Sequence, residues 1–312
     1  MSRLSPNMHA ILKADVIELL NSKQIYTVRD FIKTESRLLE KLANLTFRET
    51  LDVKNFLIKT YSAQPKNGFE YYKHILLHSA IIETGVKSID GLLQGGLYTA
   101  NIYEICGLPA TGKTLFCLTL VKNVICNMKE NIYYLDTKQD FSARKLKQML
   151  DSVNDKQELV NVLNRTLFKT ISTKQDLIRS LLQILDQLNE RFNLRVVVID
   201  SLPALYLQSS DHTENNSFLN YMTNILRFMT VEYNVVIVIT NLITLWNEGS
   251  FKTQDEFKER VSCGKYWYNI PNVRLKFQKV SDKKCKVSLM KSVKIMPDVR
   301  ECDIELTQVG IR

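Results

Sequence analysis

The chain has little of what would assign it to several protein classes. None of its six cysteines forms a C-x-x-C pair, so the sequence indicates neither a zinc ribbon nor a dithiol redox centre. No apolar run reaches the ~18 residues that a membrane span needs. Residues 1–13 also lack the apolar core of a signal peptide. We therefore expect a protein without membrane association in a reducing compartment, the cytosol or the nucleus.

Repeats and low-complexity segments are also missing, which leaves an ordinary globular protein. The 312 residues suffice for one large domain and a small one. Their hydrophobic content of 45% and charged content of 24% are those of soluble globular domains.

Acidic residues are nearly absent from residues 265–294, where Asp282 stands alone. This stretch has a net charge of +8, against +9 for the whole chain. Its nine basic residues are Lys265, Arg274, Lys276, Lys279, Lys283, Lys284, Lys286, Lys291 and Lys294. Four aromatic residues are interleaved with them, namely Tyr266, Trp267, Tyr268 and Phe277. Two interpretations stay open: a nucleic-acid surface, or lysines on the solvent face of strands, where they prevent edge pairing.

Periodicity and turn signals divide the chain into three parts. Residues 1–62 read as a small all-α domain whose first helix starts at Ser5-Pro6-Asn7. Residues 63–80 are polar and turn-rich, which predicts a linker. Residues 81–312 form the α/β part, where apolar runs at 132–136, 196–200 and 235–240 stand between helical patterns and indicate a mostly parallel sheet. Strands without intervening helices at 272–278, 285–292 and 303–306 predict an antiparallel C-terminal extension.

Within the α/β part, eight residues fit G-x-x-x-x-G-K-[ST], the phosphate-binding loop of nucleotide triphosphatases. They are Gly107, Leu108, Pro109, Ala110, Thr111, Gly112, Lys113 and Thr114. An alternating strand pattern precedes them and an apolar helix pattern follows, which is the context that this motif requires. The loop amides and the helix N-terminus attract an anion. We expect Lys113 to reach the β- and γ-phosphates and the Thr114 hydroxyl to bind Mg²⁺.

An acidic residue at the end of a second strand supports this interpretation. Residues 196–200 are an apolar run that ends in Asp200. The carboxyl ends of parallel strands border the ligand crevice, so we expect Asp200 to hold Mg²⁺ through water. Its alternative role is to cap the following turn.

Several segments resemble the RecA-type recombinases. Residues 84–97 are similar to the stretch before the phosphate loop of that family, and residues 238–241 to its strand before the second DNA loop. Residues 4–6, 61–68 and 96–99 are most similar to the D branch of the eukaryotic paralogues. The resemblance covers nearly the whole chain. It implies a RecA-like P-loop ATPase core behind a helical N-terminal domain, with ATP and Mg²⁺ as cofactors.

Two departures from the family affect hydrolysis. At the position of Lys138 the strand-transferring members have a glutamate that polarises the attacking water, and Asp140 would replace it only in a rebuilt loop. At the position of Leu242 the family has a glutamine that senses the γ-phosphate. Losing a general base typically costs about 10²–10⁴ in rate, so we expect slow hydrolysis. Lys138 itself is either a solvated surface lysine or a cation near a phosphate of this or an adjoining subunit.

Further departures affect assembly and DNA binding. The self-assembly motif of the filament formers, Phe-x-x-Ala, would fall at residues 69–72, where the bulky Tyr72 replaces the alanine. The first DNA loop would lie at residues 209–216, which are acidic and lack arginine. The second would span residues 243–265, where acidic residues nearly balance the basic ones, so we expect weak phosphate affinity from this loop alone.

The resemblance and these departures together favour an ATP-dependent assembly subunit over a recombinase. We expect a nuclear subunit of a hetero-oligomeric mediator complex in homologous recombination and double-strand break repair. The implied partners are other recombinase paralogues, docked through the N-terminal domain and the core, the recombinase filament, and single-stranded or branched DNA. The alternatives are a DNA-stimulated ATPase or strand-exchange enzyme, and an interaction subunit with a vestigial nucleotide site.

Overall fold

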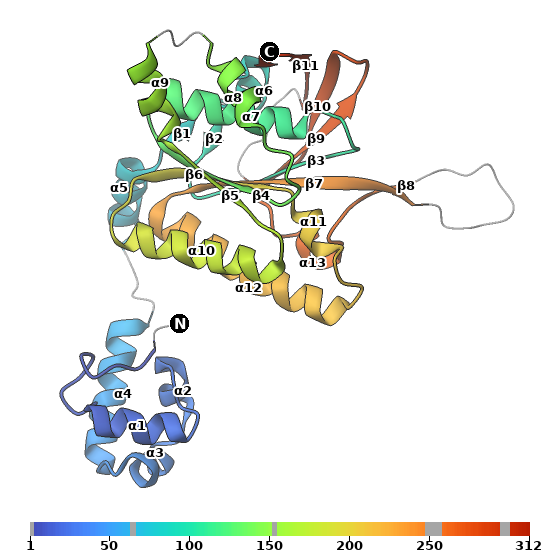
Figure 1. Ribbon diagram of the computed structural model, residues 1–312. Helices are drawn as coiled ribbons and strands as arrows, with labels where there is room; N and C mark the ends of the chain where they lie inside the picture. The colour runs from blue at the N-terminus through green and yellow to red at the C-terminus, as the bar shows by residue number, and fades with distance from the viewer. Residues whose placement is uncertain (1–2, 63–66, 152–154, 247–257, 294–299) are drawn as a thin grey trace, which may run out of the picture. The chain divides into compact units, whose positions relative to one another are not determined.

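The chain folds into two compact units, Met1–His74 and Ile75–Arg312 (Figure 1). The computed structural model describes residues 3–62, 67–151, 155–246, 258–293 and 300–312. Within these ranges no helix combines the length and the apolar character that crossing a bilayer requires.

The smaller unit is helical, as the sequence predicts. Its helices are α1 (Ala14–Ser22), α2 (Val28–Lys33), α3 (Ser36–Ala43) and α4 (Phe47–Tyr61). Capping boxes start α2 and α4. The hydroxyls of Thr27 and Thr46 each accept the backbone amide three residues on, and the backbone amide of each threonine donates to the carboxylate of that same residue, Asp30 or Glu49. The buried side chains of this unit form a core of their own, which includes Leu12, Leu20, Phe31, Leu39, Val53 and Leu57.

The helix start predicted at Ser5-Pro6-Asn7 is wrong, since α1 begins at Ala14. Leu4 is buried, and its amide donates to the Tyr26 carbonyl at 2.9 Å, which holds the beginning of the segment extended. The Met8 amide closes a single turn on the Ser5 carbonyl at 3.2 Å. Tertiary pairing therefore overrides the local capping signal.

Helix α5 (Gly68–His78) lies in the segment predicted as a linker, and the boundary between the two units falls inside it. The side-chain oxygen of Asn67 accepts a hydrogen bond from the Phe69 amide at 2.8 Å, which helps to start the helix. Phe69, Tyr71 and Tyr72, which correspond to the self-assembly motif, are helical and exposed.

The larger unit is built on a mixed sheet of order β12-β11-β10-β9-β3-β7-β6-β4-β5, with β8 paired to β7. The strands β3 (Ile102–Gly107), β4 (Asn131–Asp136), β5 (Thr166–Thr170), β6 (Leu194–Asp200), β7 (Val236–Trp246) and β9 (Val273–Lys279) are parallel. Antiparallel partners are β8 (Lys258–Val261), β10 (Lys284–Ser292), β11 (Glu301–Thr307) and β12 (Gly310–Ile311). β1 (Ile81–Ile82) and β2 (Leu97–Tyr98) form a separate antiparallel pair. The predicted fold class, including the antiparallel extension, is confirmed.

Helices cover both faces of this sheet (Figure 1). One face carries α10 (Lys174–Asn189), α11 (Leu202–Tyr206), α12 (His212–Tyr233) and α13 (Gly264–Tyr268). The other carries α6 (Lys87–Leu92), α7 (Lys113–Asn123) with its π-helical continuation η1 (Val124–Met128), α8 (Ala143–Met149) and α9 (Lys156–Leu163). Successive residues of β6 belong to opposite cores: Val198 packs on the α7 side and Ile199 on the α10 side. This explains its unbroken apolar run.

Candidate nucleotide-binding site

The predicted phosphate loop connects the buried strand β3 directly to helix α7. A Cβ at Gly107 would come within 2.3 Å of the Phe277 carbonyl oxygen on the neighbouring β9. Gly112 has φ +91°, and a Cβ there would meet Leu306 of β11 at 2.7 Å. Both glycines of the motif are therefore required by the fold itself.

Lys113, the first residue of α7, is only 6% exposed. Its ammonium donates to the carbonyls of Gly107 at 2.9 Å and Leu108 at 2.7 Å. Burial, followed by repulsion from Lys138, lowers the pKa of Lys113 to about 8, and the charge of Asp200 offsets part of this shift. The loop carbonyls thus hold this cation where an anion on the loop amides would meet it.

A pocket of about 550 Å³ opens at the loop. Its lining residues are Pro109, Ala110, Thr111, Gly112, Lys113, Thr114, Leu115, Lys138, Asp140, Leu242 and Leu306. The fold therefore brings most of the loop residues together with Lys138 and Leu242, which replace hydrolytic groups of the family. Asp140, the candidate substitute for the general base, lines the same pocket. Leu306 was missed by sequence reasoning, because nothing in its local pattern indicates that β11 packs over the loop.

Asp200 ends β6 beside the site and is 1% exposed. Its two oxygens accept hydrogen bonds from the Tyr134 hydroxyl at 2.8 Å and the Thr240 hydroxyl at 2.5 Å. Burial and then the negative charge of Asp200 raise the pKa of Tyr134 well above its usual value, which keeps this phenol protonated as a donor. Tyr134 on β4 and Thr240 on β7 orient the carboxylate from the two strands that flank β6. Sequence analysis did not identify the tyrosine.

Thr114 and Asp200 fit a magnesium site of the type that the motif implies. The Thr114 side chain lines the pocket and makes no hydrogen bond with the described residues. Asp200 remains a hydrogen-bond acceptor of fixed orientation that would hold an ion through water. A bound magnesium ion would neutralise phosphate charge. The chain's own part is to present one free hydroxyl and one oriented carboxylate.

The loop after β4 is fixed by its own hydrogen bonds. The buried carboxylate of Asp136 accepts the amides of Lys138 at 3.0 Å, Asp140 at 3.4 Å and Phe141 at 2.9 Å. The Thr137 hydroxyl accepts the Ser201 amide at 2.7 Å, which ties the ends of β4 and β6 together. This arrangement places Lys138 and Asp140 on the pocket wall.

A buried polar network lies behind the phosphate loop. Glu104 of β3 is fully buried and accepts hydrogen bonds from the Asn241 amide at 2.5 Å, the Trp267 indole at 2.7 Å and the Arg274 guanidinium. Asn241 immediately precedes Leu242 on β7. The network thus links the loop strand, the strand that carries Leu242, α13 and β9.

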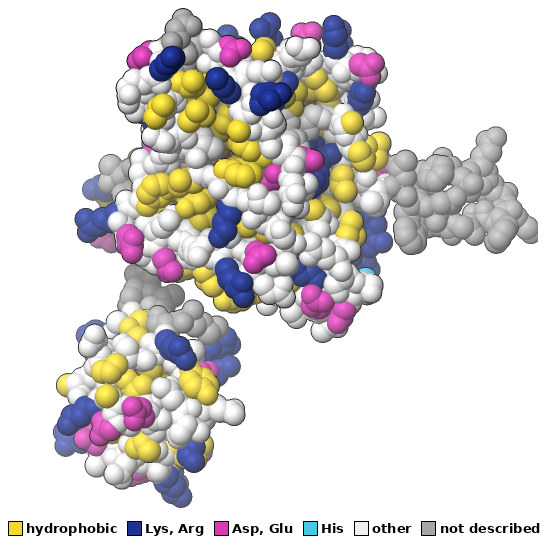
Figure 2. Space-filling view, in the orientation of Figure 1, with side chains coloured by type: hydrophobic (Ala, Val, Ile, Leu, Met, Phe, Trp, Pro, Cys, Tyr) yellow, Lys and Arg dark blue, Asp and Glu magenta, His cyan; other side chains and the backbone are white. Residues whose placement is uncertain are grey.

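The structure buries some side chains of the basic stretch 265–294 and exposes others, among them Lys265, Tyr268, Lys283 and Lys284. Trp267 and Phe277 are buried in the core, and Arg274 is 1% exposed. Acidic partners lie within 4 Å of three lysines: Glu259 pairs with Lys276, Asp282 with Lys279 and Glu301 with Lys286. On the visible face of the larger unit, Lys and Arg side chains lie among Asp and Glu side chains (Figure 2). Lys294 lies outside the described residues.

The segment predicted as the first DNA loop, residues 209–216, is partly helical. Helix α12 already begins at His212, because the Asp211 side chain accepts the Thr213 amide at 2.7 Å and caps it. The second predicted loop, 243–265, contains the end of β7 and all of β8, and its residues 247–257 lie outside the described part of the chain.

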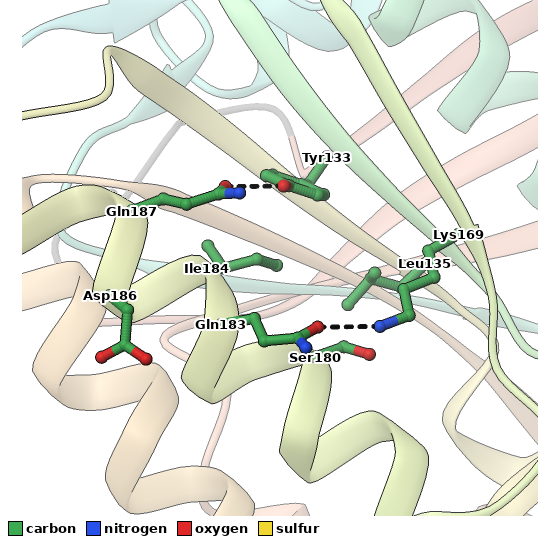
Figure 3. A pocket seen from close by; sticks show the side chains of 8 residues that line it. All are labelled: Tyr133, Leu135, Lys169, Ser180, Gln183, Ile184, Asp186 and Gln187. Carbon is green, nitrogen blue, oxygen red and sulfur yellow. Dashed lines mark hydrogen bonds between the residues drawn. The ribbon is translucent and has the colours of Figure 1, made fainter. Parts of the chain in front are cut away.

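A second pocket, of about 410 Å³, lies between α10 and the strands β4 and β5 (Figure 3). Tyr133 donates to Gln187 at 2.6 Å and Lys169 to Gln183 at 2.9 Å, so its polar groups satisfy one another. We assign no ligand to it.

The C-terminal strands support the helix that follows the loop. In β12, the Ile311 amide donates to the Thr119 hydroxyl of α7 at 3.0 Å. A Cβ at Gly310 would come within 3.0 Å of the same oxygen. The antiparallel extension is therefore joined to the phosphate-loop helix as well as to the sheet.

A strand, a glycine loop and a helix headed by lysine, set at the carboxyl edge of this sheet, define a P-loop nucleotide-binding protein of RecA-like fold. Comparison with known proteins narrows the class. The family model described as Rad51 matches residues 77–312, and that described as RAD51D, N-terminal domain, matches residues 1–59. The chain belongs to the Rad51 family.

Individual relatives agree with this assignment. The chain is 27% identical over 274 residues to DNA repair protein RAD51 homolog 4 of Bos taurus, covering 85% of this chain and 81% of the relative. It is 22% identical over 320 residues to RAD51 homolog 2 of Mus musculus, covering 90% of each. It is 30% identical over 165 residues to RadB of Archaeoglobus fulgidus, covering 52% of this chain and 70% of the relative. The resemblance to the D branch is confirmed by the N-terminal match and by homolog 4.

Proposed function

We propose that this chain is an ATP- and Mg²⁺-binding Rad51 paralogue that acts as an assembly subunit in homologous recombination and double-strand break repair. Membership of the Rad51 family implies nucleotide binding. In our proposal the Gly107-to-Thr114 loop binds the phosphates, and Thr114 and Asp200 hold the metal ion. Nucleotide occupancy then controls association with other subunits.

One observation carries this proposal: a single pocket combines the residues of the phosphate loop with Lys138 and Leu242, which stand where the family has polar catalytic groups. Lys113, Thr114, Lys138 and Leu242 all line this pocket of about 550 Å³. A protonated lysine takes no proton from water, and a leucine makes no hydrogen bond to phosphate. Such a site is suited to holding a nucleotide and poorly suited to hydrolysing it.

The proposed partners are other recombinase paralogues, the recombinase filament and single-stranded or branched DNA, in the nucleus. The relatives named DNA repair protein RAD51 homolog 4 support the repair role. The helical unit, which is compact by itself, offers one docking module, and the RecA-like core offers another. Tyr72, in place of a small residue, argues against self-polymerisation, so the purified chain alone should form no regular nucleoprotein filaments by electron microscopy.

The first experiment compares ATP binding and hydrolysis by the full chain and by Lys113→Ala, with and without single-stranded DNA. Tight binding that requires Lys113, with little turnover, supports the nucleotide-controlled assembly subunit. Undetectable nucleotide affinity of the wild-type chain supports the vestigial site and refutes the proposal.

A second candidate function, a DNA-stimulated ATPase, rests on Asp140. This exposed carboxylate lines the pocket beside Lys138. Rapid DNA-stimulated turnover that disappears in Asp140→Asn would establish Asp140 as the base. Turnover that survives this change but disappears in Lys113→Ala would indicate another base.

A further inference from the structure

Two lysines from different elements face the same pocket. Lys113 begins α7, and Lys138 follows β4; both line the space at the phosphate loop. Their situations differ. Lys113 donates to loop carbonyls, whereas the half-buried Lys138 ammonium has no hydrogen bond or ion pair with the described residues. Among the described residues, Lys138 is therefore a cation without a paired anion.

The backbone of Lys138 is held in place rather than carried on a loose loop. The Asp136 carboxylate, 1% exposed, accepts the Lys138 amide at 3.0 Å and the Phe141 amide at 2.9 Å. Thr137, next to Lys138, is bonded to both the amide and the carbonyl of Ser201, each at 2.7 Å. The backbone from which the Lys138 side chain extends is therefore already ordered, so ligand binding has to immobilise only the rotamers of the side chain itself.

The charges around the pocket favour an anion between the two lysines. Of the described residues that line it, Asp140 alone is acidic, and it is exposed. Asp200 does not line the pocket, and its charge offsets only part of the lowering of the Lys113 pKa. The charge of Lys138 is, after burial, the second cause that lowers the pKa of Lys113, so the two ammonium groups repel each other inside the pocket. Leu242 and Leu306 add apolar surface to the lining, which strengthens nearby charge interactions.

We propose that Lys138 binds the terminal phosphate of a nucleoside triphosphate in the pocket of its own chain, opposite Lys113. This inference rests on the proposed function, because it requires a nucleotide on the phosphate loop. It decides between the two roles that the sequence left open for Lys138. A diphosphate lacks the group that Lys138 contacts, so this residue makes the site selective for triphosphate over diphosphate.

The test measures the affinities of the full chain for ATPγS and for ADP by isothermal titration calorimetry in magnesium buffer. Lys138→Ala should weaken ATPγS binding about 10- to 100-fold, the size of one charge-assisted hydrogen bond, and leave ADP binding within about twofold. Lys138→Arg should keep most of the selectivity. Lys147→Ala, an exposed lysine of α8 outside the pocket, should bind both nucleotides like the wild type.

The outcomes separate the two proposals. If Lys138→Ala binds both nucleotides like the wild type, or loses both equally, while Lys113→Ala abolishes binding, Lys138 has no terminal-phosphate role and the nucleotide-binding function stands. If the wild-type chain binds neither nucleotide, the proposed function fails and this inference fails with it. Equal thermal unfolding midpoints of Lys138→Ala and wild type establish that the comparison reports binding. Should Lys138→Ala misfold, Lys138→Gln, which keeps the length of the side chain, replaces it.

Discussion

The carboxylate of Glu104, on the strand that leads into the phosphate loop, forms a buried ion pair with the guanidinium of Arg274 on β9. Arg274 also donates to the Tyr268 carbonyl at 2.9 Å and stacks over the ring of that residue at 4.5 Å. The pair joins β3, the strand that carries the loop, to its parallel neighbour β9, which in turn pairs antiparallel with β10.

Removing one partner of this pair should therefore destabilise the larger unit. Arg274→Met leaves the Glu104 charge buried, and we expect the free energy of unfolding to fall by about 3–5 kcal/mol. The fluorescence of the buried Trp267 during denaturant unfolding measures the change. As a control, Lys286→Met removes an exposed pair with Glu301 and should leave the midpoint unchanged. Equal midpoints for the two variants would contradict the prediction.

The hydroxyl of Tyr134 should matter for metal-dependent nucleotide binding. Tyr134→Phe removes one of the two hydrogen bonds that orient Asp200, and outer-shell changes of this kind typically cost about 10–100-fold in metal affinity. We expect a higher Mg²⁺ concentration for half-maximal ATPγS binding. Tyr133→Phe, on the opposite face of β4, loses only a bond to Gln187 and serves as the matched control. The role of Tyr134 is refuted if the two variants require the same Mg²⁺ concentration.

Two glycines should respond to alanine in opposite directions. Gly112→Ala forces a side chain onto φ +91° and against Leu306, which strains the loop by at least the 1–2 kcal/mol that a left-handed residue costs. We expect lower stability and weaker nucleotide binding. Gly91→Ala in α6 meets nothing within 4 Å and should stabilise the helix by about 0.5–1 kcal/mol. The thermal unfolding midpoints of the two variants test this prediction. A midpoint of Gly112→Ala above that of the wild type would contradict it.

The smaller unit should lose stability in acid through the cap of α4. The hydrogen bonds from Thr46, its amide first and then its hydroxyl, lower the pKa of Glu49 from its usual 4.5. A carboxyl with a lowered folded-state pKa stabilises the fold above its unfolded pKa, and this contribution disappears as the pH falls through the folded value. Glu49→Gln should therefore open α4 more than wild type at pH 6 and equally at pH 3. Hydrogen exchange of α4 peptides, compared at each pH, measures this.

The control for this prediction is Glu18→Gln, an exposed carboxyl of α1 that makes no hydrogen bond with the described residues. Its exchange should match that of the wild type at both pH values. A gap between Glu49→Gln and wild type that persists at pH 3 would mean that the cap acts through something other than its charge.

Features that depend on residues close together in the sequence are predicted well, whereas features that depend on residues far apart in the sequence are not. The strand, loop and helix around residues 107–114, the parallel strands and the antiparallel extension follow from local patterns and are confirmed. For the oriented carboxylate, the sequence predicts Asp200 but not its hydrogen-bond donor Tyr134, because the two residues are 66 residues apart and belong to different strands. The contact of Leu306 with Gly112 is likewise determined by sheet order, which periodicity does not encode.

The basic stretch shows that local composition alone does not say which of its side chains reach the surface. Arg274 reads as one of nine surface cations but pairs with a carboxylate 170 residues away in the core. Trp267 donates to the same carboxylate rather than lying open to bases. Charge counts along a chain therefore say little about a surface until partners distant in sequence are known.

The bond between the Ile311 amide and the Thr119 hydroxyl has a consequence for how alleles of this gene would be interpreted. A nonsense or frameshift change that removes β12 would take away a contact of the helix that starts at Lys113. Such an allele should resemble, in a genetic screen, a missense change in the phosphate loop. Alleles that remove Gly310 and Ile311 should therefore be grouped with nucleotide-site alleles rather than counted as benign.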